Sequence, residues 1–405
     1  MSMPRLILLM LTALLTAGLC GPTAMAAPHA KAKPKAAAAS PSASAPASSS
    51  GIDTEAAHAI IVEVETGAVL LDKGADERMP PASMSKMMTA YVVFGMLKDG
   101  KAKLTDELPV SEDAWRTSGS KMFVPLGGRI SISDLLRGMI VQSGNDACVV
   151  LAQGLAGSVE AFVDLMNQKA KEIGLKDSHF ANVDGLPDPN HWMTARDLAT
   201  LAIRTIKDFP EYYKIYSEMD FTFNNIKQGN RNPLLYKNMG ADGLKTGHTE
   251  EAGYSLTGSI VRGERRIIIV LGGLPTMKSR AEESERLADW AFREFNDYHL
   301  FTAGDKVEDA QVWLGNDARV PLTVGKDLVV TLSRNARKNM QVSVQYDSPL
   351  PAPVQKGETV GKIVVAAPDT PQQETPLVAS ADVPRMDAMG RIATLAGYLV
   401  WGNRH

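Results

Sequence analysis

Hydrophobic and polar residues follow a strand-like pattern at both ends of the first folded region and a helical pattern between them. Aliphatic residues dominate 57–64 and 68–71, and the pair Thr66-Gly67 separates the two runs, which predicts a β-hairpin. From about Pro81 to Asp208, apolar residues recur three and four positions apart. That period is typical of helices with one buried face, so the middle of the region is predicted to be mainly helical.

Strand patterns return after the helical region. Tyr254–Val261 and Arg266–Leu271 are predicted strands, and Arg280–Phe295 is a predicted amphipathic helix. A sheet built from both ends of a segment, with helices inserted in the middle, is typical of an α+β domain. We therefore expect one α+β domain over residues 51–297.

Beyond residue 297 the pattern changes again. Short β-branched runs separated by Gly, Asn, Asp and Pro predict a small, β-rich domain over residues 298–384. Residues 385–405 form a predicted amphipathic helix, and Asp387 and Arg391 interrupt its apolar stripe, which disfavours a membrane-spanning helix. We expect this helix to lie in a membrane interface; packing against its own β-rich domain is the alternative.

The first 50 residues predict export. A positive start at Arg5, an apolar run over 6–15 and the small-x-small site at 24–26 are typical of a signal peptide over residues 1–26. Residues 27–50 are almost wholly Ala, Ser, Pro and Lys, which predicts a disordered tether. We expect a periplasmic protein attached peripherally to the outer face of the cytoplasmic membrane.

Composition and charge narrow the function. The 405 residues are 44% hydrophobic and 22% charged, with a formal net charge of −3, as in a folded chain of two or three domains. Without Arg5 and the tether residues Lys31, Lys33 and Lys35, the charge falls to −7. An acidic body argues against nucleic acid as a partner, and we expect no cofactor and no metal.

The first candidate catalytic pair is Ser83 and Lys86, which open the first strongly apolar helical segment. Residues three apart share a helix face, so the hydroxyl and the amine can meet. A lysine acts as a base only when its amine is partly neutral, and burial is one way to lower its pKa. Alone, the pattern is also explained by a helix N-cap followed by a solvated charge.

Two further motifs follow along the chain. Ser143-Gly144-Asn145 lies between two apolar helical runs, where a fixed turn could orient a neutral lysine and a substrate amide. Lys245-Thr246-Gly247-His248-Thr249 leads into a strand. Its cation, its hydroxyl and a glycine that permits close backbone approach suggest a docking edge for an extended anionic peptide.

Together, the three motifs resemble those of low-molecular-mass penicillin-binding proteins, the serine D-alanyl-D-alanine carboxypeptidases. The resemblance rests on the stretches 81–88, 142–147 and 242–249 and runs from about Gly51 to the C-terminus. It implies a β-lactamase/transpeptidase-like catalytic domain with a mainly helical insert, a small β domain and a C-terminal amphipathic helix. It also implies peptidoglycan stem peptides ending in D-Ala-D-Ala as substrates and β-lactams as ligands.

The resemblance implies an acyl-enzyme mechanism. Ser83 would attack the carbonyl of the penultimate D-Ala, and Lys86 would take its proton. Ser143 and Asn145 would relay protons and hold the substrate amide. The substrate would be bound by residues of the third motif and by an arginine downstream, namely Lys245, Thr246, Gly247, His248 and Arg280. Of these, Lys245, Thr246 and Arg280 would contact its terminal carboxylate. By the same analogy, the backbone N–H groups of Ser83 and His248 would form the oxyanion hole.

Three alternatives stay open. A class A β-lactamase shares the serine, the lysine and the Lys-Thr-Gly strand, but Gly144 stands where those enzymes have Asp, and they lack the extra C-terminal domain. A non-catalytic peptidoglycan-binding module would be expected to lose Ser83 or Lys86, and both are present. A peptidoglycan D,D-endopeptidase of the same superfamily is the third.

A group of metal-ligand residue types lies in the turn-rich stretch after the helical region. These are His179, Asp184, Asp188 and His191. They lack a zinc motif or an i, i+4 histidine pair, so we attribute the aspartates to turn formation.

Overall fold

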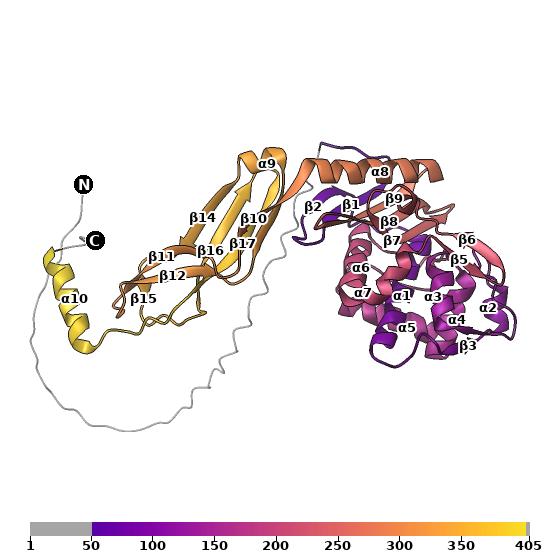
Figure 1. The fold of residues 1–405 in the computed structure, drawn as a ribbon, viewed down its shortest axis with the longest axis horizontal. Coiled ribbons are helices and arrows are strands. Elements are labelled where there is room, and N and C mark those ends of the chain that lie inside the picture. The colour runs from indigo at the N-terminus through magenta and orange to yellow at the C-terminus, as the bar shows by residue number, and fades with distance from the viewer. Residues whose placement is uncertain (1–50, 402–405) are drawn as a thin grey trace, which may run out of the picture. The chain divides into compact units, whose positions relative to one another are not determined.

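The computed structural model describes residues 51–401. The predicted signal peptide (1–26) and tether (27–50) lie outside the described residues, as do residues 402–405. Within the described part, a helix-rich α+β region comes first along the chain and a β-rich region follows (Figure 1). This matches the fold class predicted from the hydrophobic pattern.

The first region is organised around a five-stranded antiparallel sheet. The N-terminal hairpin pairs with strands that are about 200 residues later in the chain, giving the order β2-β1-β9-β8-β7. β7 is therefore an edge strand. The five strands are β1 (His58–Glu63), β2 (Val69–Lys73), β7 (Ala241–Thr249), β8 (Gly253–Arg262) and β9 (Arg265–Leu274).

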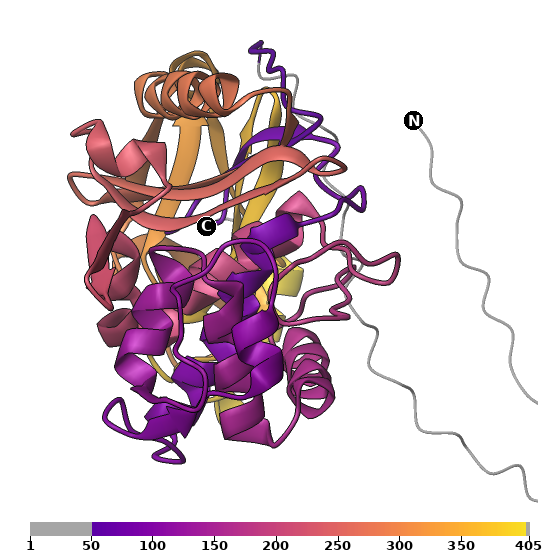
Figure 2. The same ribbon diagram turned by 90° about the vertical axis from the view of Figure 1, so that its right-hand side faces the viewer.

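Alternation along the strands divides the core into two layers. Ile61 and Ile269 belong to the cluster on the side of α8 (Met277–Glu294), whereas Ile60 and Ile268 belong to the cluster on the helical side. Successive strand residues point to opposite faces, so a run such as 267–271 is buried throughout. Figure 2 shows α8 and the helical group on opposite sides of the strands.

The helical insert fills the chain between β2 and β7. Its main helices are η1 (Ala82–Ser85), α1 (Lys86–Lys98), α2 (Glu112–Arg116), α3 (Ile132–Ile140), α4 (Asn145–Ala156), α5 (Val159–Glu172), α6 (Ala195–Asp208) and α7 (Pro210–Tyr213). Short elements complete it: β3 (Glu107–Pro109), β4 (Arg129–Ser131), η2 (Lys214–Ser217), β5 (Asp220–Phe223), β6 (Ile226–Gly229) and η3 (Pro233–Tyr236). α1 is buried nearly all round, so the sequence that follows Ser83 forms the centre of the insert.

The second region contains a six-stranded sheet in the order β14-β16-β17-β12-β11-β15, and β10 pairs with β13. Its strands are β10 (Phe295–Phe301), β11 (Lys306–Trp313), β12 (Arg319–Val324), β13 (Leu328–Ser333), β14 (Gln341–Tyr346), β15 (Leu350–Pro351), β16 (Thr359–Ala367) and β17 (Thr370–Ala379). α9 (Arg334–Lys338) and α10 (Ala388–Trp401) are its helices. The aliphatic side chains of this region form a core cluster of their own.

None of the helices in residues 51–401 is, by itself, both long and apolar enough to cross a membrane; α4 and α5 satisfy that test only as a pair bent by 87°.

Candidate active site

Ser83 and Lys86 meet at the junction of η1 and α1. Lys86 is the first residue of α1, and its Nζ lies 2.9 Å from the Ser83 Oγ. Ser83 stays partly exposed, whereas Lys86 is 1% exposed. The hydroxyl can therefore reach a bound molecule while the amine beneath it is shielded from water.

Burial sets the protonation chemistry of Lys86. Desolvation lowers the pKa of its amine, because burial disfavours the charged form. The amine also donates a hydrogen bond of 2.5 Å to the backbone carbonyl of Asp184. A neutral amine held by that carbonyl keeps a lone pair for the proton of Ser83, as general-base activation of a serine requires.

Ser143 and Asn145 lie in the turn between α3 and α4. Ser143 has a left-handed backbone (φ +63°) and is 1% exposed, a conformation that costs free energy for a residue with a Cβ. Asn145 begins α4, and its side-chain amide donates to the carbonyl of Ser118 over 2.8 Å. This hydrogen bond attaches the turn to the segment 118–120.

Asp146 anchors the residues just after this segment, 122–124, and sequence reasoning assigned it no role. Its fully buried carboxylate accepts hydrogen bonds from the backbone N–H groups of three consecutive residues, 122–124, and from its neighbour Ala147. The sequence signal for this role was an acidic residue at the start of an apolar helix. A carboxylate buried there needs several hydrogen-bond donors.

The Lys-Thr-Gly motif lies inside edge strand β7, whereas the sequence pattern placed it before a strand. Lys245 is 3% exposed, and its Nζ donates to the Ser143 Oγ over 3.0 Å. Burial, with the charge of Lys86 as the next cause, lowers the pKa of Lys245 well below its usual value. A Cβ at Gly247 would stand 2.9 Å from the carbonyl oxygen of Pro81, so this position needs a glycine to bring β7 against η1.

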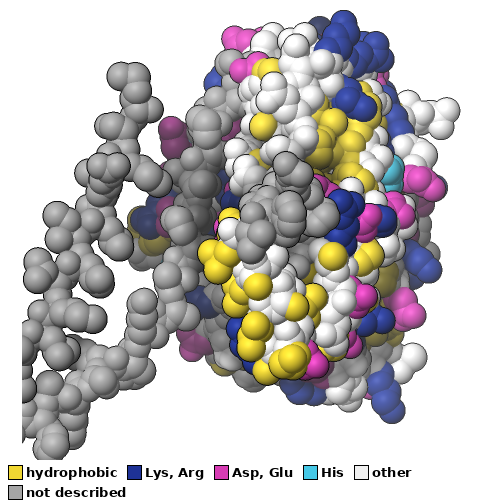
Figure 3. Space-filling model, turned by 90° about the vertical axis from the view of Figure 1, so that its left-hand side faces the viewer, with side chains coloured by type: hydrophobic (Ala, Val, Ile, Leu, Met, Phe, Trp, Pro, Cys, Tyr) yellow, Lys and Arg dark blue, Asp and Glu magenta, His cyan; other side chains and the backbone are white. Residues whose placement is uncertain are grey.

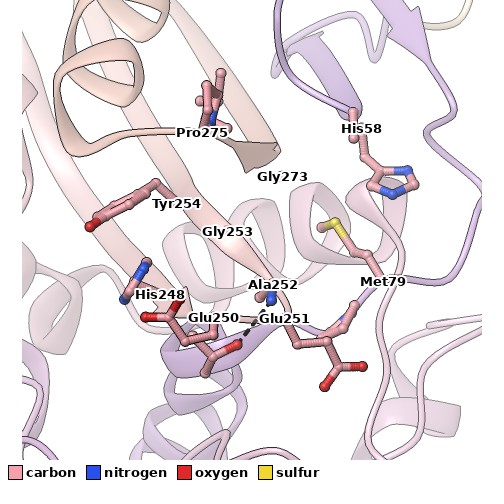
Figure 4. A pocket seen from close by; sticks show the side chains of 14 residues that line it. His58, Met79, His248, Glu250, Glu251, Ala252, Gly253, Tyr254, Gly273 and Pro275 are labelled. Atoms are coloured by element: carbon pink, nitrogen blue, oxygen red, sulfur yellow. Dashed lines mark hydrogen bonds between the residues drawn. The ribbon is translucent and has the colours of Figure 1, made fainter.

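Thr246 and His248 face the other side of β7. Their β8 partners are Leu256 and Tyr254, and Leu256 packs in the α8 cluster. The rings of His248 and Tyr254 are 4.0 Å apart between centroids, and Figure 4 shows them side by side on one wall of a cavity of about 600 Å³.

Arg280, in the first turn of α8, lies beside Tyr254 and is not among the residues that line this cavity. Its guanidinium carbon lies 5.8 Å from the centre of the Tyr254 ring, and the residue is 6% exposed. Burial lowers the pKa of Arg280. Among the residues that the structure describes, its Nε has no hydrogen-bond partner and no carboxylate forms an ion pair with it. A buried cation without a counter-charge is suited to binding an anion.

Arg231 is a further cation that sequence reasoning missed. Its guanidinium donates a 2.7 Å hydrogen bond to the Ser120 hydroxyl. Its charge also contributes to the lowered pKa values of Lys86 and Lys245. Arg231 stands between two asparagines in a turn-rich stretch, and nothing in that local pattern distinguishes it from a solvated arginine.

The four residues considered as metal ligands form no metal site within residues 51–401. These are His179, Asp184, Asp188 and His191. The carboxylates of Asp184 and Asp188 accept backbone N–H bonds from residues two positions later, so the attribution to turns is confirmed. His179 stacks on Trp192 with ring centroids 5.2 Å apart. His191 is buried against Ser85.

Comparison with known proteins gives a consistent result. The model of the family described as D-alanyl-D-alanine carboxypeptidase matches residues 41–275, and that of the penicillin-binding protein 5 C-terminal domain matches residues 295–385. The chain is 40% identical to D-alanyl-D-alanine carboxypeptidase DacA of Escherichia coli strain K12, over 84% of this chain and 86% of the relative. It is 41% identical to DacC of the same strain, over 82% and 85%.

Solved structures extend the similarity to the fold. Penicillin-binding protein 5 from Haemophilus influenzae superposes with a TM-score of 0.75 at 40% identity, covering 82% of this chain and 99% of that structure. Penicillin-binding protein D2 from Listeria monocytogenes, in its ampicillin-bound form, has a TM-score of 0.55 at 30% identity. That match covers 60% of this chain and 98% of the other.

Proposed function

The chain belongs to the D-alanyl-D-alanine carboxypeptidase family, and from this premise we propose how the side chains of its site carry out the reaction. Membership makes the chain a serine-type D-Ala-D-Ala carboxypeptidase, a hydrolase that acts on peptidoglycan and binds β-lactams. The observation that supports the proposed roles is the pairing of two buried lysines with two serines, Lys86 with Ser83 and Lys245 with Ser143.

Acylation begins at Ser83. Its Oγ attacks the carbonyl carbon of the penultimate D-Ala while its proton passes to the neutral amine of Lys86. The terminal D-Ala then leaves with a proton relayed through Ser143, which contacts Lys245. The product is an ester between Ser83 and the shortened peptide, and water hydrolyses it to regenerate the serine.

The backbone N–H groups of Ser83 and His248 form the proposed oxyanion hole. Ser83 lies in η1, at the start of the catalytic helix formed by η1 and α1, and His248 lies near the end of β7. η1 and β7 are in contact. Asn145 holds the substrate amide on the opposite side. Loss of one oxyanion donor typically costs about 10²- to 10³-fold in rate.

The terminal carboxylate of the substrate meets a group of cations. Lys245 and Arg280 are buried, and no ion pair to a carboxylate involves either of them within residues 51–401. Thr246 supplies a hydroxyl, and Gly247 and His248 continue the strand edge. A guanidinium can bind a carboxylate through two parallel hydrogen bonds, so we infer selection for peptides with a free C-terminus.

The decisive experiment measures D-alanine release from a stem pentapeptide ending in D-Ala-D-Ala, with a free or an amidated C-terminus. We expect release only from the free acid, covalent labelling of Ser83 by penicillin, and loss of both in Ser83→Ala. Label on another residue would contradict the mechanism. Equal cleavage of the amidated peptide would favour the endopeptidase alternative, and rapid turnover of penicillin would favour a β-lactamase.

Arg280 has a matched control on the same helix. Arg280→Gln should raise KM for the free-acid peptide. It should leave the free energy of unfolding, measured without penicillin, unchanged. Arg286 pairs with Glu283 at the surface, so Arg286→Gln removes the same charge from α8 without touching the site. If both variants weaken catalysis equally, net charge and not carboxylate binding explains the effect.

For localisation we propose export to the periplasm and peripheral attachment to the cytoplasmic membrane through residues 385–405. Apolar side chains of α10 support this, since Met389 is 76% and Leu399 84% exposed. Figure 3 shows hydrophobic side chains exposed on the face that it draws. Tyr398 contacts Trp313 of the β-rich region. The experiment must therefore distinguish membrane binding by α10 from packing of α10 on this region.

Vesicle sedimentation tests this attachment. Deletion of 385–405 should release the protein from vesicles, and Leu399→Asp should weaken binding because it places a charge on the apolar face. Arg391→Gln, which removes a cation that interrupts the apolar stripe and adds no charge, should not weaken binding, and added salt should have little effect. Unchanged binding of the deletion variant would show that the helix is not the anchor.

A further inference from the structure

His191 connects the turn-rich loop beside the site to the catalytic helix. The loop runs from Asn182 to His191, and the isolated bridge between His179 and Trp192 closes its base. His191 is 5% exposed, and its Nε2 lies 2.6 Å from the Oγ of fully buried Ser85. Ser85 is the residue directly before Lys86.

The hydrogen bonds of His191 determine its tautomer. The backbone N–H of Ala181 donates to Nδ1 over 3.3 Å, and a backbone N–H is only a donor. Nδ1 is therefore unprotonated and Nε2 carries the hydrogen of the neutral ring. The Nε2–H group donates to the Ser85 hydroxyl, so this contact has a defined direction.

The same loop carries the acceptor of the catalytic lysine. The carbonyl of Asp184 accepts from the Lys86 Nζ, and the carbonyl of its neighbour Val183 accepts from the Thr89 hydroxyl over 2.7 Å. A Cβ at Gly185 would stand 1.9 Å from the carbonyl oxygen of Ala82. Among these contacts, His191 supplies the only loop side chain that reaches the helix.

These contacts form a closed ring. Ser85 and Lys86 are covalent neighbours, and the loop residues they bind, His191 and Asp184, belong to one short segment. We propose that His191 is a positioning residue of the reaction. Its bond to Ser85 holds the loop so that the Asp184 carbonyl stays on the Lys86 amine and the lone pair of that amine is directed at Ser83.

This inference rests on the proposed function, because it assigns the base to Lys86. It concerns a residue that contacts neither the substrate nor the reacting atoms. Its loss should lower the rate constant of acylation and leave the affinity for substrate nearly unchanged, since the carboxylate-binding residues lie on β7 and α8.

The experiment measures acylation of Ser83 by penicillin in stopped flow, as a rate constant and an affinity separately. Ser85→Ala and His191→Leu should each reduce the rate constant about tenfold, the factor expected for one net hydrogen bond. The double variant should be no slower than either single variant. Ser85→Thr and His191→Gln, which can restore the bond, should stay within about threefold of the parent.

A matched control is His179→Gln in the same loop base. His179 is exposed and bonds the Asn190 carbonyl instead of the helix, so acylation should be unchanged. If His191→Leu fails to fold, Ser85→Ala alone carries the test, because it removes only one hydroxyl. Parent-like acylation in Ser85→Ala would overturn the inference, as would multiplicative effects in the double variant. A parent that is not acylated at Ser83 would instead overturn the proposed function.

Discussion

The Nζ of Lys245 lies 3.0 Å from the Oγ of Ser143, although the two residues are 102 positions apart. The contact joins the edge strand to the turn between α3 and α4. Because Lys245 is almost fully buried and close to Lys86, the two lysines share one electrostatic environment.

Lys245→Ala should reduce kcat/KM for D-alanine release about 10²- to 10³-fold, because a preorganised positive group near the developing charge is lost. The measurement is steady-state hydrolysis of the free-acid pentapeptide. Lys237, which pairs with Glu285 at the surface, provides the control variant Lys237→Ala. A loss below threefold in Lys245→Ala would contradict the assigned role.

The rate of acylation should rise with pH through a midpoint below the ordinary lysine value. Burial lowers the pKa of Lys86, and only the neutral amine accepts a proton, so activity is lost as pH falls. Since the charge of Lys86 lowers the pKa of Lys245, the two titrations are coupled and the midpoint belongs to the pair. Lys86→Arg should abolish acylation at every pH up to 10, because a guanidinium stays protonated. Activity in this variant would argue against a general base at position 86.

Asp146→Ala should destabilise the protein by about 3 kcal/mol, since it leaves several buried backbone N–H groups without an acceptor. The variant should also slow acylation, because the 118–124 segment would no longer be held against Asn145. Denaturant unfolding at pH 7 measures the first effect. Asp134, a partly buried acid of α3, gives the control Asp134→Ala. Equal stability of the two variants would contradict the anchoring role.

Folding stability should fall on acidification through His191. Burial lowers its pKa from 6.5 to about 4, so the unfolded chain binds a proton between these values and the folded chain does not. The contribution of His191 to the free energy of unfolding is fully present above pH 6.5. It is lost as pH falls to about 4, and the loss is about 3 kcal/mol at most. Urea midpoints of the parent and His191→Gln at pH 7.5 and 4.5 measure the difference. A parallel pH dependence would show that His191 does not contribute.

Much of the fold was predictable from local pattern. The first hairpin, the helical insert and the strands β8 and β9 have strong periodicity, and β14 (Gln341–Tyr346) has the bounds of its β-branched run. Three strands of the β-rich region, β10, β15 and β17, were not predicted. β17 contains Pro371 and Pro376 among polar residues, and β10 begins at Phe295, where the apolar period extended the preceding helix. β10 and β17 are strands because each pairs with a neighbouring strand that is distant in the sequence.

The sequence by itself determined the candidate residues of the site, because Ser83, Ser143 and Lys245 stand in motifs whose residue types suit the proposed reaction. It could not reveal that the Asp184 carbonyl binds Lys86, that Arg231 lies near both lysines, or that His191 bonds Ser85. These relationships depend on segments up to about 145 positions apart in the chain. Only folding brings them together and buries them, and that burial gives the lysines the lowered pKa values that the chemistry requires.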